Sequence, residues 1–125
     1  MSPRSHEFME QARDRAKLAQ EALASGHREG AVSAAYYAML YAARAALSEH
    51  DEYARRHGGA WGLFHRRFVA TGAFDQHLHA LAQQAQEARE AGDYEAIAPD
   101  PGEAKRYVEG AADFVAAVEK MLEVS

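Results

Sequence analysis

The chain of 125 residues contains no cysteine, and this absence excludes a disulfide framework, a thiolate zinc site and a cysteine nucleophile. Proline is also scarce, with three residues, while 48% of the residues are hydrophobic, which argues against a disordered or fibrous chain. The longest uninterrupted apolar run covers residues 34–43 and is far shorter than the roughly 18 residues of a membrane span. The N-terminus lacks the apolar core of a signal peptide. We therefore expect a soluble cytoplasmic protein that has no contact with a membrane.

The length is typical of a single folding unit, so we expect one domain over residues 1–125. The net charge of −5 is unevenly distributed along the chain. Residues 53–72 contain four arginines and no acid, whereas residues 73–125 contain eleven acidic and four basic residues. The basic segment is compatible with binding a phosphate, with docking on an acidic surface of this or a neighbouring chain, or with simple solvation.

Apolar residues recur at helical spacing almost throughout the chain, and no segment alternates with period two. Ser2 and Pro3 predict a helix start and Gly26 its end. Further helices are expected over about 29–50, 59–72 and 74–91, with Gly92 as a stop and a loop over 93–99. Asp100 predicts the start of a fifth helix, because a proline and a glutamate follow it in a variant of the capping box. The fold class predicted is all-α, a bundle of about five helices.

The seven histidines do not have the spacing of a metal site. Two ligands on one helix face need a separation of three or four residues, whereas His77 and His79 are two apart. We therefore expect no bound metal.

Arginine and tyrosine residues are the remaining candidates for chemistry. Tyr37, Tyr41 and Arg44 share one face of the second helix, and Arg55 and Arg56 precede the third. Arginine suits phosphate oxygens and tyrosine rings can stack on bases, which favours a nucleic-acid surface. The same residue types are enriched at helix–helix and dimer interfaces, so both interpretations stay open.

The end of the fourth predicted helix carries Arg89, Asp93 and Tyr94. Physical chemistry alone favours a structural role here. Arg89 in the last turn complements the helix dipole, and Asp93 and Tyr94 are suited to ordering the loop that follows.

Taken together, three tracts and a closing amphipathic helix resemble the small stand-alone prokaryotic HEPN-domain proteins, in the right order and over nearly the whole chain. The tracts are AVSAAYYAMLYAARAAL, RHGGAWGLFHRRFVATGAFD and AREAGDYE. The most specific parts are Tyr36-Tyr37 with Ala38-Met39, His57 before an aromatic helix, and the Arg89…Asp93-Tyr94 ending.

The resemblance implies an up-and-down antiparallel bundle that forms homodimers. It also implies a minimal nucleotidyltransferase as partner, in a toxin–antitoxin type of module. Many HEPN proteins are metal-independent endoribonucleases that need no cofactor. Their signature is an arginine followed, after four to six residues, by a histidine. Two such motifs meet across the dimer, where the 2′-hydroxyl attacks the adjacent phosphate, the histidine moves a proton and the arginine neutralises developing charge.

This sequence departs from that signature, because Asp93-Tyr94 follows Arg89 and no histidine does. An aspartate with an ordinary pKa of about 3.9 is a poor proton donor at neutral pH. Arg44 and His50 have the required spacing but lie on the second helix, and a pattern this loose arises easily by chance. His57 is an alternative proton donor if the fold brings it to Arg89.

Three functions follow from the resemblance. The first is an RNA-cleaving or RNA-binding toxin-like protein that uses Arg89, Asp93 and His57. The second is a non-catalytic module that binds a nucleotidyltransferase, and RNA or a nucleotide, through the same groove. Here Tyr94 is the candidate for modification by the partner. The third is a purely structural helical dimer. The residues expected to bind RNA or nucleotide are Tyr37, Tyr41, Arg44, Arg55, Arg56 and Tyr94.

Overall fold

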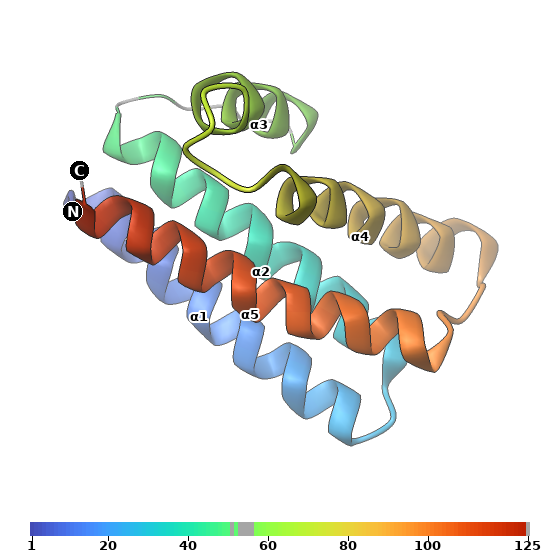
Figure 1. Ribbon diagram of the computed structural model, residues 1–125. Helices are drawn as coiled ribbons and strands as arrows, with labels where there is room; N and C mark the ends of the chain where they lie inside the picture. The colour runs from blue at the N-terminus through green and yellow to red at the C-terminus, as the bar shows by residue number, and fades with distance from the viewer. Residues whose placement is uncertain (51, 53–56, 125) are drawn as a thin grey trace.

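The computed structural model describes the chain except for residues 51, 53–56 and 125, and within the described part every regular element is a helix (Figure 1). The fold is an all-α bundle, as predicted. The elements are α1 (Pro3–Ala24), α2 (Arg28–Glu49), α3 (His57–Phe64), the π-helix η1 (His65–Val69), α4 (Gln76–Glu95) and α5 (Pro101–Val124). In the described part of the chain, no helix is long and apolar enough to cross a membrane.

Helix α2 is the centre of the bundle and packs against α1, α3, α4 and α5 (Figure 1). Its core positions are mostly alanines, whose small side chains allow the neighbouring helices to approach closely. Where α3 packs on the bundle, the core becomes aromatic. There Phe64 is fully buried and its ring lies 4.9 Å from that of Phe74 and 5.7 Å from that of Phe114.

Local signals in the sequence predicted several helix ends correctly. The Ser2 hydroxyl accepts a hydrogen bond from the Ser5 amide and caps α1. Gly26 follows this helix with a φ of +80°, a conformation that costs glycine little. Asp100 caps α5, since its carboxylate accepts hydrogen bonds from the amides of Gly102 and Glu103 at 3.1 and 3.3 Å.

The third and fourth helices differ from their predicted bounds. The third begins at His57, two residues early, and its last turn is the π-helix η1. The fourth is capped by Asp75, which leaves Phe74 outside the helix, and it continues through Gly92 to Glu95. The prediction of a stop at Gly92 and a loop from 93 was wrong, because a glycine inside a helix costs only about 1 kcal/mol.

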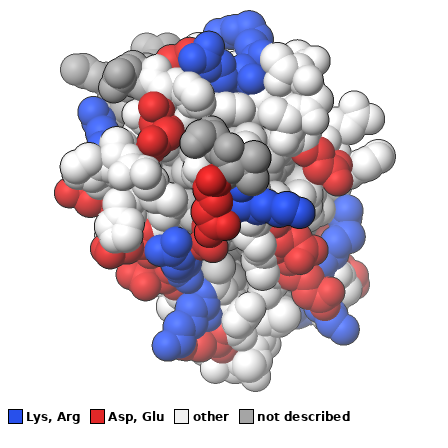
Figure 2. All heavy atoms as spheres, turned by 60° about the vertical axis from the view of Figure 1, so that its left-hand side comes forward, with Lys and Arg blue, Asp and Glu red and all other residues white. Residues whose placement is uncertain are grey.

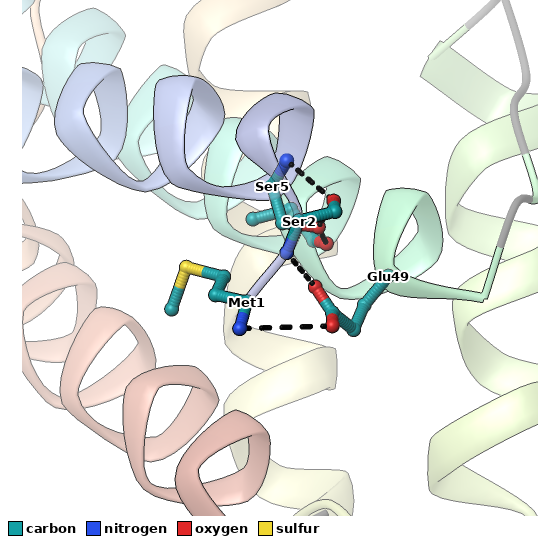
Figure 3. A network of polar contacts seen from close by, with 5 residues as sticks. Met1, Ser2, Ser5 and Glu49 are labelled. Atoms are coloured by element: carbon teal, nitrogen blue, oxygen red, sulfur yellow. Dashed lines mark hydrogen bonds and ion pairs between the residues drawn. The ribbon is translucent and has the colours of Figure 1, made fainter.

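A polar network joins the start of α1 to the end of α2 (Figure 3). The Glu49 carboxylate accepts a hydrogen bond from the Ser2 amide at 2.8 Å, and the Met1 ammonium lies 3.9 Å from it. The Ser5 hydroxyl donates to the Ala45 carbonyl at 2.8 Å. The hydrogen bond from the Ser2 backbone is the main reason that the pKa of Glu49 is lowered. These contacts fix α1 against α2, which positions the α1 side chains described next.

Candidate functional site on α1, α2 and α4

One face of α2 stays partly open. Between residues 31 and 48 every α2 side chain is buried except four, which are half-buried and lie three or four residues apart. These four residues, here called the α2 stripe, are Ser33, Tyr37, Tyr41 and Arg44. Helices α1 and α4 both pack on α2, but their described residues do not contact each other. The stripe therefore remains accessible.

Arg89 of α4 lies against this stripe. Its guanidinium carbon lies 5.4 Å from the ring centroid of Tyr36 and 5.5 Å from that of Tyr37, within cation–π range. Its Nη1 donates to the Asp93 carboxylate at 2.9 Å, and its side chain is 18% exposed. This ion pair depends on the continuation of α4 through Gly92, because only an unbroken helix places residues 89 and 93 one turn apart.

The Arg89 side chain is held more tightly than an ordinary surface arginine. Two aromatic rings and one carboxylate constrain it, while its Nε is buried without a hydrogen-bond partner. Below it, the Tyr36 hydroxyl accepts a hydrogen bond from Trp61 Nε1 at 3.1 Å. Burial raises the pKa of the Tyr36 phenol, so that group is neutral at physiological pH.

A row of rings continues from Arg89 toward α1. The Tyr37 and Tyr41 rings are 6.3 Å apart, and the Phe8 ring stacks on Tyr41 at 6.1 Å. Arg15 of α1 also contacts this row, because its guanidinium carbon lies 5.5 Å from the Tyr41 ring centroid. We call Arg89, Tyr37, Tyr41, Phe8 and Arg15 the arginine–aromatic row. It crosses three helices and has a cationic group on α1 and another on α4.

Phe8 and Arg15 were not identified as site residues from the sequence. Phe8 is one of the recurring apolar residues of the first helix, and no motif in the sequence contains Arg15. The signal that would have found them is their spacing of seven residues, which places both on the face of α1 that meets Tyr41.

Four other predicted site residues lie wholly or partly outside the described part of the structure. Arg55 and Arg56 lie outside the described residues, as do the side chains of His57 and Tyr94. The proposed approach of His57 to Arg89 therefore stays a prediction. Arg44 and His50 are six positions apart on or just beyond one helix, and so lie on different faces. The His50 ring packs at 5.6 Å on Phe68.

The pocket beside Arg89 is narrow. It has a volume of about 20 Å³, is lined by Glu29, Ser33 and Asp93 among others, and has room for roughly one water molecule. A larger ligand would therefore lie along the arginine–aromatic row rather than inside the bundle. Among the described residues, no group of three histidines or acids is close enough to hold a metal ion.

Charge is mixed on the end of the molecule that carries both termini. Figure 2 shows lysines and arginines interspersed with aspartates and glutamates on that face.

The fold and this arrangement define a small helical bundle whose central helix is left open beside an arginine in the C-terminal half of a neighbouring helix. The HEPN domain family matches residues 5–121, and the chain belongs to this family. It is also similar to the UPF0332 protein glr0978 of Gloeobacter violaceus. The two are 30% identical over 94 residues, which is 75% of each chain.

Proposed function

We propose that this HEPN-domain protein is a non-cleaving interaction module. It binds RNA or a nucleotide along the arginine–aromatic row and is the toxin-like partner of a minimal nucleotidyltransferase. The observation that carries the proposal is the 2.9 Å ion pair between Arg89 and Asp93.

The ion pair opposes phosphodiester cleavage in two ways. An arginine that neutralises a cleavage transition state needs its charge free for the phosphate, whereas here a carboxylate already neutralises it. The negative charge of the carboxylate also repels an approaching phosphate. The Arg89–Asp93 pair is therefore suited to stabilising helix α4 and to forming part of a binding surface, and it is poorly suited to acid–base chemistry.

The arginine–aromatic row supports binding rather than catalysis. Base stacking on an aromatic ring contributes about 1–3 kcal/mol per base and is tolerant of sequence. Tyr37 and Tyr41 are half-buried, so their rings are held in place before a ligand arrives. Arg15 provides positive charge on α1, at a position that a phosphate backbone crossing Tyr41 would reach, while Arg89 stacks on Tyr37 and holds its ring in place for a base.

The experiment separates the three functions. The purified chain is incubated with structured RNA in the absence of metal, and RNA binding and cleavage are measured together. A second arm measures co-purification with a co-expressed minimal nucleotidyltransferase. We expect intact RNA, measurable binding and co-purification.

Two variants sharpen this test. Arg89→Ala is expected to weaken RNA binding at least several-fold. Arg13→Ala is the matched control, because Arg13 also pairs with an acid, Glu119, but on the α1–α5 side of the bundle. Cleavage that leaves cyclic phosphate ends and is lost in Arg89→Ala would establish the endoribonuclease instead. The absence of both RNA binding and a partner would leave the structural dimer.

A further inference from the structure

Two histidine rings from different helices meet beside a groove between α4 and the segment formed by α3 and η1. His65 of η1 and His79 of α4 both line this groove, and their ring centroids are 5.3 Å apart. Imidazole nitrogens are good ligands for Zn²⁺, Ni²⁺ and Cu²⁺. We propose that His65 and His79 together bind one divalent transition-metal ion, which links η1 to α4. The proposal is independent of the function assigned to the arginine–aromatic row.

The separation of the two rings fits a shared ion. A metal–nitrogen bond of about 2.1 Å places an ion about 3.2 Å from the centroid of each imidazole ring that binds it. Two rings bound to one ion at a tetrahedral angle therefore have centroids about 5.2 Å apart. The 5.3 Å between His65 and His79 is close to this value, and the two rings are tilted by 49° rather than stacked face to face. The distance between the two side chains thus already matches a shared ion.

His79 is already arranged as a metal ligand. It is 6% exposed, and its Nε2 is buried without a hydrogen-bond partner. Its hydrogen bond with the Trp61 backbone therefore involves Nδ1, which donates its proton to the carbonyl and leaves the lone pair on Nε2. Metal-binding histidines commonly have this arrangement, because the second hydrogen bond fixes the ring and its tautomer. Burial is the main reason that the pKa of His79 is lowered, which keeps the ring neutral, as metal binding requires.

His65 offers the second imidazole from an exposed position. It belongs to the π-helix η1, whose wide turn is closed by a hydrogen bond from the Ala70 amide to the His65 carbonyl at 2.8 Å. Such turns are rare and occur frequently at functional sites. His65 and His79 lie on different helices, so histidine spacing along a single helix could not reveal the pair.

Two protein ligands leave the remaining coordination positions to water. Among the described residues there is no group of three histidines or acids at this or any other place, and the groove volume of about 550 Å³ has room for water. No carboxylate lines the groove, and Arg66 does, so the nearby charge opposes a cation. The affinity therefore depends on the imidazoles, and we expect Cu²⁺ to bind more tightly than Zn²⁺, in the general order for nitrogen ligands.

The fluorescence of Trp61 provides the test. Trp61 is the single tryptophan of the chain, it is buried, and its ring centroid lies 5.8 Å from that of His79. Cu²⁺ bound at His79 quenches this fluorescence, whereas Cu²⁺ in solution reaches the buried ring poorly. In a titration of the whole chain with Cu²⁺ we expect saturable quenching with a Kd of about 10 μM or tighter. A large excess of Zn²⁺ should reverse the quenching and Mg²⁺ should not, because Mg²⁺ prefers oxygen ligands.

Three variants locate the ion. His65→Ala is expected to weaken Cu²⁺ binding at least about tenfold, because one imidazole remains. His65 is exposed, so this substitution leaves the core intact. His79→Phe should abolish the saturable quenching, with circular dichroism as the check on folding. His77→Ala is the matched control, since His77 is also exposed and lies on α4 but does not line the groove, and its effect should be less than about twofold.

Several results would overturn the proposal. Absence of saturable quenching, or quenching that His65→Ala leaves unchanged, would show that the pair does not bind the ion. Equal weakening by His65→Ala and His77→Ala would show that scattered surface histidines bind it instead. Reversal of the quenching by Mg²⁺ as effectively as by Zn²⁺ would refute imidazole ligation. Arg89→Ala is expected to leave Cu²⁺ binding unchanged, so the histidine pair and the arginine–aromatic row are tested separately.

Discussion

The contact between Gly110 of α5 and Leu81 of α4 sets how closely the helix that carries Arg89 approaches its neighbour. A Cβ built on Gly110 would lie 1.9 Å from Leu81 Cδ2 and 3.2 Å from its Cγ. Replacing a glycine inside a helix by alanine normally stabilises a protein by about 0.5–1 kcal/mol. At this position Leu81 must move, and overpacking of this kind costs about 1–3 kcal/mol. We therefore predict that Gly110→Ala lowers the free energy of unfolding by about 0.5–2 kcal/mol.

The prediction is sharpest as a double-mutant cycle. In a Leu81→Ala background the obstructing atoms are absent, so Gly110→Ala should now stabilise the protein by about 0.5–1 kcal/mol. The coupling between the two substitutions is therefore expected to be about 1–3 kcal/mol. Urea denaturation followed by circular dichroism measures each free energy of unfolding, with the m-value as a check on two-state behaviour.

Gly30→Ala is the matched control. Gly30 is exposed in the first turn of α2, and its Cβ would meet only the His27 Cβ, at an ordinary 3.9 Å. This substitution should raise stability by up to about 1 kcal/mol. The reasoning is refuted if Gly110→Ala stabilises the protein as Gly30→Ala does, or if its effect is the same with and without the Leu81 side chain.

Three further predictions concern buried or titrating groups. Trp61→Phe removes the hydrogen bond to the Tyr36 hydroxyl and should cost about 1–3 kcal/mol in urea denaturation, and a loss below about 0.5 kcal/mol would contradict the buried bond. The pKa of Glu49 is lowered in the folded state, so its stabilising effect is present above its ordinary value of 4.5 and is lost as the pH falls through the folded pKa. Stability profiles from pH 3 to 6 should therefore be flatter for Glu49→Gln, and identical slopes would argue against the Ser2 contact. The pKa of His79 is also lowered in the folded state, so the unfolded state binds the proton more readily. The free energy of unfolding therefore decreases as the pH falls below the ordinary value of 6.5. His79→Phe should remove this component below pH 6.5, and an unchanged slope there would show that another group titrates.

The amino-acid sequence determined those features that depend on neighbouring residues. The all-α class follows from helical periodicity, and the caps at Ser2 and Asp100 follow from side chains that reach amides two or three positions away. Trp61, Phe64 and Phe68 are spaced three and four residues apart, and all three are buried, as this helical spacing predicts. The Arg89…Asp93 segment was identified as a feature of interest, but it was placed at a helix end and in a loop.

Tertiary structure decided what surrounds those residues. Arg89 stacks on Tyr36 and Tyr37, more than fifty positions earlier in the chain, and Arg15 reaches Tyr41 only because α1 packs along α2. The physical reason is that caps and periodicity are local, whereas the partners of a side chain are set by which helices share a core. A single sequence gives that information only through the fold itself.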